Sequence, residues 1–244
     1  HLLIAGCIFI LLGMVTAVGG YLWLNSRLPP ITALTNYQPD TPMRIYARDG
    51  SVIGEFGAET RYPLSPEAIP EKLKSAFLAA EDASFFEHPG IDIKGIIRAL
   101  IADIQAGAPV QGASTITQQV ARTFLLTRER TIMRKLREMV LAFRIERRLT
   151  KPEILHLYLN QIYLGNGAYG VEAAARIYYD KTVHQLNLAE MAMIAGLPKA
   201  PASFNPAANP ERARDRRDYV LSRMAETGLA DPEAVARARR TPIH

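Results

Sequence analysis

The chain has 244 residues and a formal net charge of +5, and 48% of its residues are hydrophobic. This length allows one domain of ordinary size with short appendages and a real hydrophobic core. The single cysteine, Cys7, excludes an intrachain disulfide and a cysteine-based metal site. The basic excess suits an anionic partner, which leaves nucleic acid, anionic lipid headgroups and pyrophosphate as candidates.

The first predicted element is an apolar run over residues 2–24 that contains no charged residue. A helix of this length can cross a bilayer, and Tyr21 and Trp23 lie at its far end, where amphipathic aromatic residues favour the headgroup layer. A cleaved signal peptide is the alternative, but the residues after the run make a poor cleavage site. We therefore expect a transmembrane anchor over residues 1–27, and no nucleic-acid partner.

Residues 28–62 are expected to form a linker followed by a β-hairpin. Prolines are frequent up to residue 42, and two strand-like runs then flank Asp49-Gly50, a dipeptide typical of a tight hairpin turn. A two-stranded ribbon is only marginally stable alone. We therefore expect the hairpin, residues 44–56, to lie against the main domain.

Helical patterns dominate from residue 63 onward, so the predicted fold class is mainly α. Leu73, Phe77 and Glu81 are spaced four apart, which places a carboxylate at the tip of an apolar stripe on a helix over residues 70–81. A carboxyl group held partly out of water has a raised pKa and can act as an acid or base. The alternative is an ordinary surface pair formed by Glu81 and Asp82.

Further helices are predicted from capping and stop signals. Asp92 is the expected N-cap of a helix that ends at Gly107, and Thr150 and Asn187 each begin a capping box. Other helices are predicted to begin near Ser114, to cover residues 171–178 and 210–227, and to follow Asp231.

Two segments concentrate side chains suited to an anion. Residues 112–119 place hydroxyls and amides at a helix N-terminus, where free backbone N–H groups favour anions; an ordinary helix cap is the alternative. Arg130, Arg134 and Glu138 share one face of a later helix, and Arg122 could join them. Guanidinium groups grip phosphate oxygens bidentately, whereas the alternative is a solvated basic helix.

Taken together and in this order, four segments resemble the family 51 glycosyltransferases, which are the peptidoglycan polymerases of class A penicillin-binding proteins and their monofunctional relatives. The resemblance covers residues 44–227. Arg122 stands where some relatives carry lysine, and His156 stands where relatives often carry glutamate. The family patterns are met at Glu81, Asp82, Phe85, His88 and Gly90, at residues 112–119, at Arg134, Lys135 and Glu138, and at Lys151, Ile154, Leu155, Tyr158 and Asn160.

The resemblance implies a lysozyme-like, two-lobed glycosyltransferase domain over residues 63–228, with residues 229–244 as the truncated start of a following segment. It implies polymerisation of lipid II into glycan strands, with inversion at the anomeric carbon and release of polyprenyl pyrophosphate. Glu81 would be the general base, and Glu138 the second catalytic carboxylate. The implied substrate-binding residues are Asp82, Phe85, His88, Gly112, Ser114, Thr115, Gln118, Gln119, Arg122, Arg130, Arg134 and Lys135.

The same resemblance implies partners and a location. The substrates would be lipid II and the lipid-linked growing strand, at the outer face of the bacterial cytoplasmic membrane, with a single-pass anchor. Moenomycin-type inhibitors and other cell-wall synthesis proteins would be further partners. No tightly bound cofactor is expected; a divalent cation such as Mg²⁺ could accompany the pyrophosphate, and no metal-binding residue is assigned. Phe124, Leu125 and Leu126 are expected to dip into the headgroup layer.

Two other functions stay open at this point. A lysozyme-like lytic hydrolase would also use a glutamate in a cleft, but it would leave the Arg/Lys cluster without a role. An inactive membrane-anchored cell-wall scaffold would need neither the glutamate nor the Arg/Lys cluster. The hairpin resembles that of bifunctional class A enzymes, although no Ser-x-x-Lys or Lys-Thr-Gly motif of a transpeptidase occurs in the chain. We therefore interpret the chain as a fragment of a bifunctional enzyme.

Overall fold

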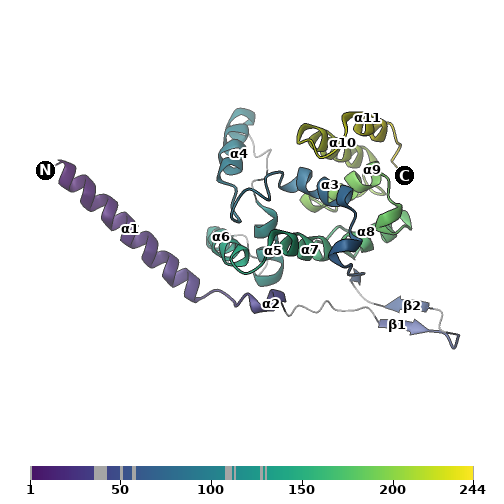
Figure 1. Cartoon of the computed structure of the whole chain (residues 1–244), viewed down its shortest axis with the longest axis horizontal. Coiled ribbons are helices and arrows are strands. Elements are labelled where there is room, and N and C mark those ends of the chain that lie inside the picture. The colour runs from purple at the N-terminus through teal and green to yellow at the C-terminus, as the bar shows by residue number, and fades with distance from the viewer. Residues whose placement is uncertain are drawn as a thin grey trace.

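The computed structural model describes residues 2–35, 43–49, 52–56, 59–107, 112, 114–126, 129 and 131–243, with backbone alone for residues 2–10, 17, 33, 35, 43–46 and 52–56. Over these residues the chain is mainly helical, as predicted, and the strands form two very small sheets (Figure 1). The helices therefore supply almost all of the framework that positions the site.

The N-terminal helix α1 (Leu2–Ser26) extends away from the rest of the helices, and the short helix α2 (Thr32–Thr35) follows it (Figure 1). A helix is thus present where the anchor over residues 1–27 was predicted. The side chains of α1 are described from Leu11 onward, and among the described residues no helix is both long and apolar enough to cross a membrane.

The predicted hairpin is present as β1 (Met43–Tyr46) and β2 (Val52–Phe56), which pair antiparallel. Gly50 of the predicted turn lies outside the described residues. Figure 1 shows the two strands projecting from the helices, so the expectation that they lie against the main domain is wrong for the described backbone. In the described backbone the two strands pair only with each other, and neither joins β3 and β4.

A second, parallel pair of strands was not predicted from the sequence. β3 (Thr60–Arg61) pairs with β4 (Ala168–Tyr169), with Thr60 opposite Ala168. The guanidinium of Arg61 lies over the ring of Tyr169, 4.2 Å from its centroid. Strands of two residues are too short to leave an alternating pattern in the sequence, which explains why the pattern missed them.

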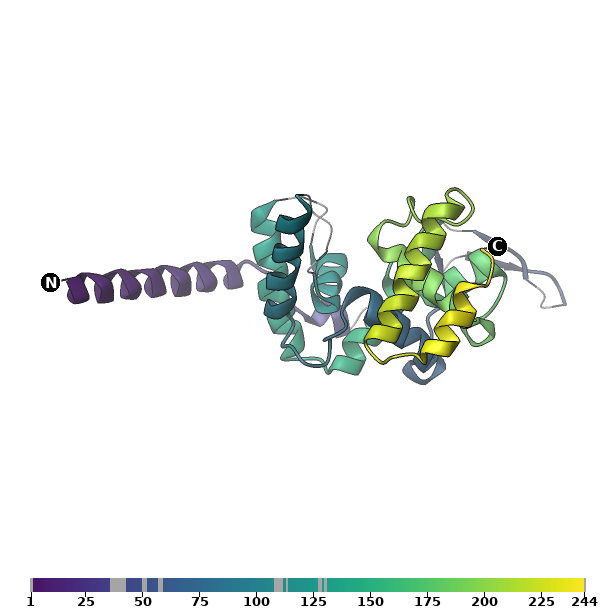
Figure 2. The ribbon, with the colours of Figure 1, turned by 90° about the horizontal axis from the view of Figure 1, so that it is seen from above.

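One group of helices lies on the side of the molecule nearer to α1 (Figure 2). It contains α4 (Ile93–Ala106), α5 (Ile116–Leu125) and α6 (Ile132–Glu146), and α5 packs against α6. The predicted cap of α4 is present, because the Asp92 side chain accepts a hydrogen bond from the Gly95 N–H at 2.8 Å.

A second group lies farther from α1 (Figure 2). Its main helix is α10, which packs against α9, α3 and α11. Leu73 and Phe77 of α3 are fully buried, so α3 is a core element between its neighbours. The helices of this group are α3 (Glu71–Glu81), α8 (Val171–Tyr179), α9 (Leu188–Gly196), α10 (Pro210–Glu226) and α11 (Pro232–Arg239), with the 3₁₀ turns η1 (Pro66–Ala68), η2 (Val183–Gln185) and η3 (Leu197–Lys199). Helix α7 (Lys151–Gln161) packs mainly against α5 of the first group (Figure 1).

The C-terminal residues 229–243 pack onto the same group. Val235 and Ala238 of α11 are buried. The buried Arg217 of α10 donates hydrogen bonds to the backbone carbonyls of Thr241 at 2.6 Å and Arg239 at 3.1 Å. Residues 229–244 are predicted from the sequence to begin a following segment, whereas residues 229–243 contact the helical domain itself.

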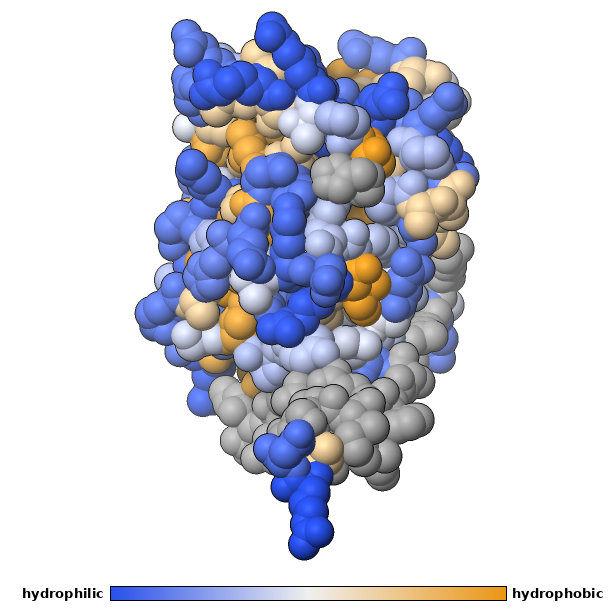
Figure 3. Space-filling view, turned by 90° about the vertical axis from the view of Figure 1, so that its right-hand side faces the viewer, coloured by the Kyte–Doolittle hydropathy of each residue, from blue (hydrophilic) through white to orange (hydrophobic). Residues whose placement is uncertain are grey.

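The apolar face of α4 is open to solvent. Ala99 is the single buried residue of this helix, while Ile93 and Ile104 are 66% and 71% exposed. The end of the molecule opposite α1 differs, because Figure 3 shows a mostly hydrophilic surface there with scattered apolar residues. Phe124, Leu125 and Leu126 pack, partly buried, against the core, and their contact with the headgroup layer stays a prediction.

Candidate active site

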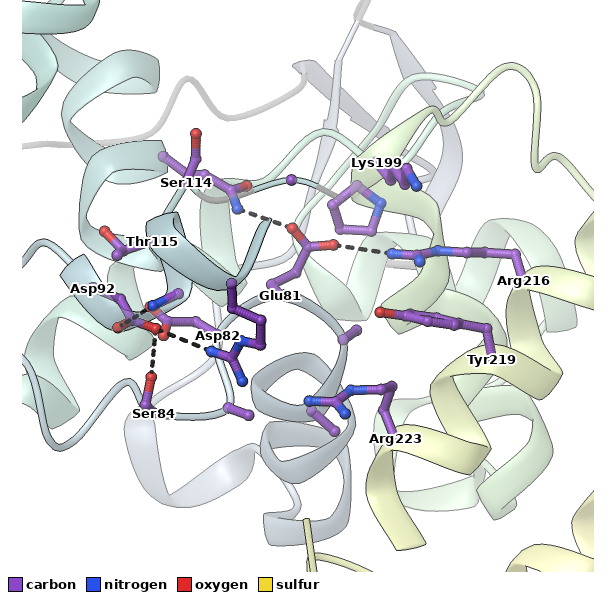
Figure 4. Close-up of a pocket in the computed structure, with 18 of the residues that line it drawn as sticks. Glu81, Asp82, Ser84, Asp92, Ser114, Thr115, Lys199, Arg216, Tyr219 and Arg223 are labelled. Atoms are coloured by element: carbon purple, nitrogen blue, oxygen red, sulfur yellow. Dashed lines mark hydrogen bonds and ion pairs between the residues drawn. The ribbon is translucent and has the colours of Figure 1, made fainter. Parts of the chain in front are cut away.

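A cavity of about 540 Å³ lies where the two groups of helices meet (Figure 4). Its wall is formed by the end of α3, the N-terminal parts of α4 and α5, the turn η3 and one face of α10. The predicted site residues that line it are Glu81, Asp82, Gly112, Ser114, Thr115, Gln119 and Arg122.

Glu81 is the last residue of α3, and its side chain is only 12% exposed. The Gln119 side-chain N–H donates to Glu81 Oε2 at 2.9 Å, and Arg216 Nη2 lies 3.4 Å from Oε1. Desolvation by burial raises the pKa of Glu81 above its usual value. The Gln119 hydrogen bond lowers this pKa in part, as do the charges of Arg216, Arg122 and Lys199.

The amide of Gln119 is itself oriented by a buried tyrosine. Tyr158 on α7 donates its hydroxyl hydrogen bond to Gln119 Oε1 at 3.2 Å, which leaves the amide nitrogen facing Glu81. Burial raises the pKa of Tyr158 well above its usual range, and the charge of Glu81 adds to this effect. The Tyr158 hydroxyl therefore stays protonated. The tyrosine of the Lys151–Asn160 motif thus acts on the carboxylate through one intermediate side chain.

Asp82 lines the cavity, and its carboxylate is held in a buried hydrogen-bond network. His88 Nε2 lies 2.9 Å from Asp82 Oδ1, and the Ile116 backbone N–H donates to Oδ2 at 3.0 Å. His88 Nδ1 accepts from the Gly90 N–H at 3.1 Å, so the ring carries its proton on Nε2 and donates it to Asp82. The carboxylate therefore ties the turn after α3 to the start of α5.

This network corrects the expectation that the N-terminus of α5 has free N–H groups for an anion. The Ile116 N–H is taken by Asp82, and the Gln118 N–H donates to Thr115 Oγ1 at 3.1 Å. The Gln118 side chain in turn accepts from the Thr115 N–H at 3.0 Å. The capping box, which was the alternative interpretation, accounts for these residues.

Five of the predicted substrate-binding residues that the structure describes lie outside the cavity lining: Phe85, His88, Gln118, Arg134 and Lys135. Phe85 is fully buried, with Lys151 Nζ 4.3 Å from its ring centroid. The same ammonium donates to the His88 carbonyl at 2.7 Å. Phe85, His88 and Gln118 therefore lie behind the cavity lining, where they hold the segments that carry Glu81 and Thr115.

A second cluster joins the cavity at its edge. Glu138 on α6 is fully buried and pairs with Arg134 Nη1 at 2.7 Å and Lys135 Nζ at 3.0 Å. Lys135 Nζ also donates to Ser114 Oγ at 2.7 Å, and Ser114 lines the cavity. Glu138 therefore fixes two cations beside the cavity. Arg130, the third predicted cation of this cluster, lies outside the described residues.

The wall of the cavity that α10 supplies was not predicted from the sequence. Arg216, Tyr219 and Arg223 line the cavity from α10, on the side opposite Ser114 and Thr115, and Arg216 points at Glu81 (Figure 4). The residues are spaced three and four apart, so they share one helix face. That spacing was a usable signal, but it was hidden in an Arg-rich helix typical of a solvated surface.

The described residues contain no group of three or more His, Cys, Asp or Glu side chains that could hold a metal ion. The carboxylate nearest to the cations, Glu138, is already paired with Arg134 and Lys135. No side-chain metal site is therefore assigned within the part of the chain that the structure describes.

A largely buried glutamate with a raised pKa, in a cavity that also carries arginine and lysine side chains, marks a candidate site for proton transfer. Comparison with known families makes the class specific: residues 49–225 match the transglycosylase family. The chain belongs to this family, as the sequence resemblance implied.

Curated relatives are similar over nearly the whole chain. Penicillin-binding protein 1A of Pseudomonas aeruginosa is 46% identical over 239 residues, which cover 98% of this chain and 29% of the relative. The protein of the same name from Escherichia coli strain K12 is 49% identical over 244 residues, covering 100% of this chain and 29% of the relative. The chain thus spans less than a third of the length of these relatives.

One solved structure is also similar. The crystal structure of penicillin-binding protein 1A from Haemophilus influenzae, at 2.6 Å resolution, superimposes with a TM-score of 0.52 and 32% sequence identity. The match covers 85% of this chain and 21% of that chain. It supports the mainly helical glycosyltransferase fold.

Proposed function

We propose that this domain polymerises lipid II into glycan strands, with inversion at the anomeric carbon and release of polyprenyl pyrophosphate. The observation that carries the proposal is the Glu81 carboxylate, which is buried, has a raised pKa and faces a cavity lined by cations. Such a carboxylate can remove the proton from the 4-hydroxyl of the acceptor sugar. The resulting oxygen attacks the anomeric carbon of the lipid-linked strand, and the pyrophosphate leaves.

The cations suit the charge that develops on the leaving group. Lys135 is held between Glu138 and Ser114 at the cavity edge, and Arg122 lines the cavity on α5. Donors that are fixed before the reaction stabilise developing negative charge without reorganising. In this proposal Glu138 orders Arg134 and Lys135 and takes no proton itself. Any Mg²⁺ would arrive with the pyrophosphate of the substrate.

We further infer that the two groups of helices are the lobes of a lysozyme-like fold, with the α4 lobe toward the membrane. The support is the exposed apolar face of α4, because an amphipathic helix without a protein partner can bury that face at the headgroup layer. A single-pass anchor over residues 1–27, with the domain outside the bacterial cytoplasmic membrane, belongs to the same proposal and depends on the uncharged run of residues 2–24. Moenomycin-type inhibitors and other cell-wall synthesis proteins stay proposed partners.

The direct test is incubation of the purified chain with lipid II, with and without a moenomycin-type phosphoglycolipid. We expect long glycan strands on electrophoresis without the inhibitor and none with it. A lytic hydrolase would instead shorten preformed glycan, and a scaffold would leave both substrates unchanged. Either of those results would contradict the proposal.

The α4 face gives a second prediction. Ile97 and Ile101 are 54% and 51% exposed, and burying one isoleucine side chain is worth about 1.5–3 kcal/mol. The double substitution Ile97→Ser and Ile101→Ser should lower polymerisation of lipid II in vesicles by about tenfold, while activity in detergent micelles stays near that of the parent. Ile177→Ser, on the other group of helices, is the matched control. Equal loss in vesicles and micelles would argue against a membrane contact.

A further inference from the structure

Arg216 is the most firmly held cation of the cavity wall. It lies on α10 and its side chain is 8% exposed. Its Nε–H donates to the Gly196 carbonyl at 3.1 Å, and its guanidinium carbon lies 4.8 Å from the centroid of the Tyr219 ring. Phe204 approaches the same guanidinium at 5.8 Å. A hydrogen bond to Gly196 and two rings thus orient this group before any substrate is present.

The backbone of α9 makes room for this side chain. A methyl group added at Gly196 would meet Arg216 Cγ at 2.9 Å. Cγ is close to the backbone of α10 and cannot swing aside as the tip of a long side chain could. Gly196 has an ordinary helical backbone, with φ −78°, so what it provides is space for Arg216. This contact is independent of the ion pair with Glu81.

The fixed guanidinium points its Nη2 at Glu81 Oε1, 3.4 Å away (Figure 4). The other groups around Glu81 are Gln119 and Arg122 on α5, Lys199 in η3, Tyr158 on α7 and the adjacent Asp82. Of the cations, Arg216 forms the ion pair with the carboxylate and has the strongest charge effect on it. Because both groups are largely buried, solvent screens their attraction only weakly.

We propose that Arg216 is a positioning residue for the general base: its guanidinium keeps the Glu81 carboxylate ionised and directed into the cavity. The inference depends on the proposed function, because a base matters only if a proton is removed from an acceptor hydroxyl. Burial alone would favour the protonated acid, which cannot take up that proton. Arg216 opposes this effect from one side of the carboxylate, and Gln119 opposes it from the other.

The first test is the pH profile of polymerisation for Arg216→Gln and Arg216→Lys. Removing the cation raises the pKa of the base, so the acid limb of kcat for Arg216→Gln should move up by about one pH unit. At a pH on that limb, the rate should fall by about tenfold and recover at higher pH. Arg216→Lys keeps the positive charge, so its acid limb should move less than that of Arg216→Gln.

Arg214→Gln is the matched control, since Arg214 is exposed on the same helix and does not line the cavity. Its profile should follow that of the parent. An equal loss of rate at every pH in Arg216→Gln would indicate a merely structural role and overturn the inference. A raised KM with an unmoved acid limb would indicate substrate binding and overturn it as well.

Gly196→Ala tests the ion pair between Arg216 and Glu81 without removing either charge. The added methyl group displaces Arg216, so the acid limb should move in the same direction as in Arg216→Gln, by a smaller amount. The melting temperature of each variant shows whether it is folded. An unmoved limb in a folded Gly196→Ala protein whose arginine has shifted would contradict the proposal.

A direct titration separates this inference from the proposed function. The carboxyl signals of ¹³C-labelled glutamate can be followed by NMR, with Glu81→Gln identifying the Glu81 signal by its loss. If the parent does not polymerise lipid II but the Glu81 titration moves up in Arg216→Gln, the pairing is supported and the proposed function fails. If the titration does not move, the inference fails whatever the activity.

Discussion

Glu81→Gln should lower the rate of glycan polymerisation by about 10²–10⁴-fold, the usual contribution of a general base. The amide has nearly the shape of the carboxylate, and its single carbonyl oxygen can still accept from Gln119, so the cavity should keep its form. What is lost is the ability to take the proton of the acceptor hydroxyl. The measurement is a single-turnover assay with lipid II, with Glu87→Gln, exposed and outside the cavity, as the matched control.

The same variant has a defined effect on stability. Because the pKa of Glu81 is raised in the folded state, the folded protein holds this proton more tightly than the unfolded chain does. The stability linked to the proton is present below the unfolded pKa of about 4.3 and is lost as the pH rises through the raised folded pKa. Gln has no such loss, so at pH 7 the variant should melt at the same temperature as the parent or higher.

Two results would argue against this role of Glu81. Near-normal polymerisation by Glu81→Gln would show that another group takes the proton. A large fall in melting temperature, with activity lost in proportion to unfolded protein, would show that the carboxylate is structural. The acid limb of the parent's pH profile is a further check, because it should lie above the usual range for glutamate.

The parts of this domain that the sequence could predict depend on neighbouring residues. Asp92, Thr115 and Asn187 cap helices through bonds that reach only three residues along the chain. The apolar stripe that ends at Glu81 is likewise local, since its residues are four positions, or about one helical turn, apart. These signals survive in a single sequence because the partner is always at the same spacing.

The parts that the sequence could not predict depend on pairs far apart in the chain. Arg216 meets Glu81 across 135 positions, and Asp82 meets the Ile116 N–H across 34. Nothing in an Arg-rich helix tells which guanidinium turns inward. The family resemblance marked Asp82 and His88 as important, but the role it implied was substrate contact. Their described bonds are with each other and with the backbone.

Asp82→Asn should therefore act mainly on stability. The Asp82 carboxylate, 2% exposed, accepts from both His88 Nε2 and the Ile116 N–H. An amide offers one acceptor and brings an N–H₂ group, so one buried donor would face another donor. Leaving a buried donor unpaired costs about 1–3 kcal/mol, and a hydrogen bond to a charged acceptor lies at the upper end of that range. We expect a loss of about 3 kcal/mol in the free energy of unfolding.

For a domain of this size, such a loss lowers the melting temperature by roughly 6–12 °C. Calorimetry of Asp82→Asn measures this fall in melting temperature. Asp215→Asn, which makes the same substitution at an exposed aspartate on α10, is the control for stability. Activity per folded molecule at low temperature should fall far less than in Glu81→Gln, because the base itself is retained. An unchanged melting temperature together with a rate loss as large as that of Glu81→Gln would show that Asp82 takes part in the reaction. A side chain that only ties α3 to α5 cannot affect the reaction without also affecting the fold.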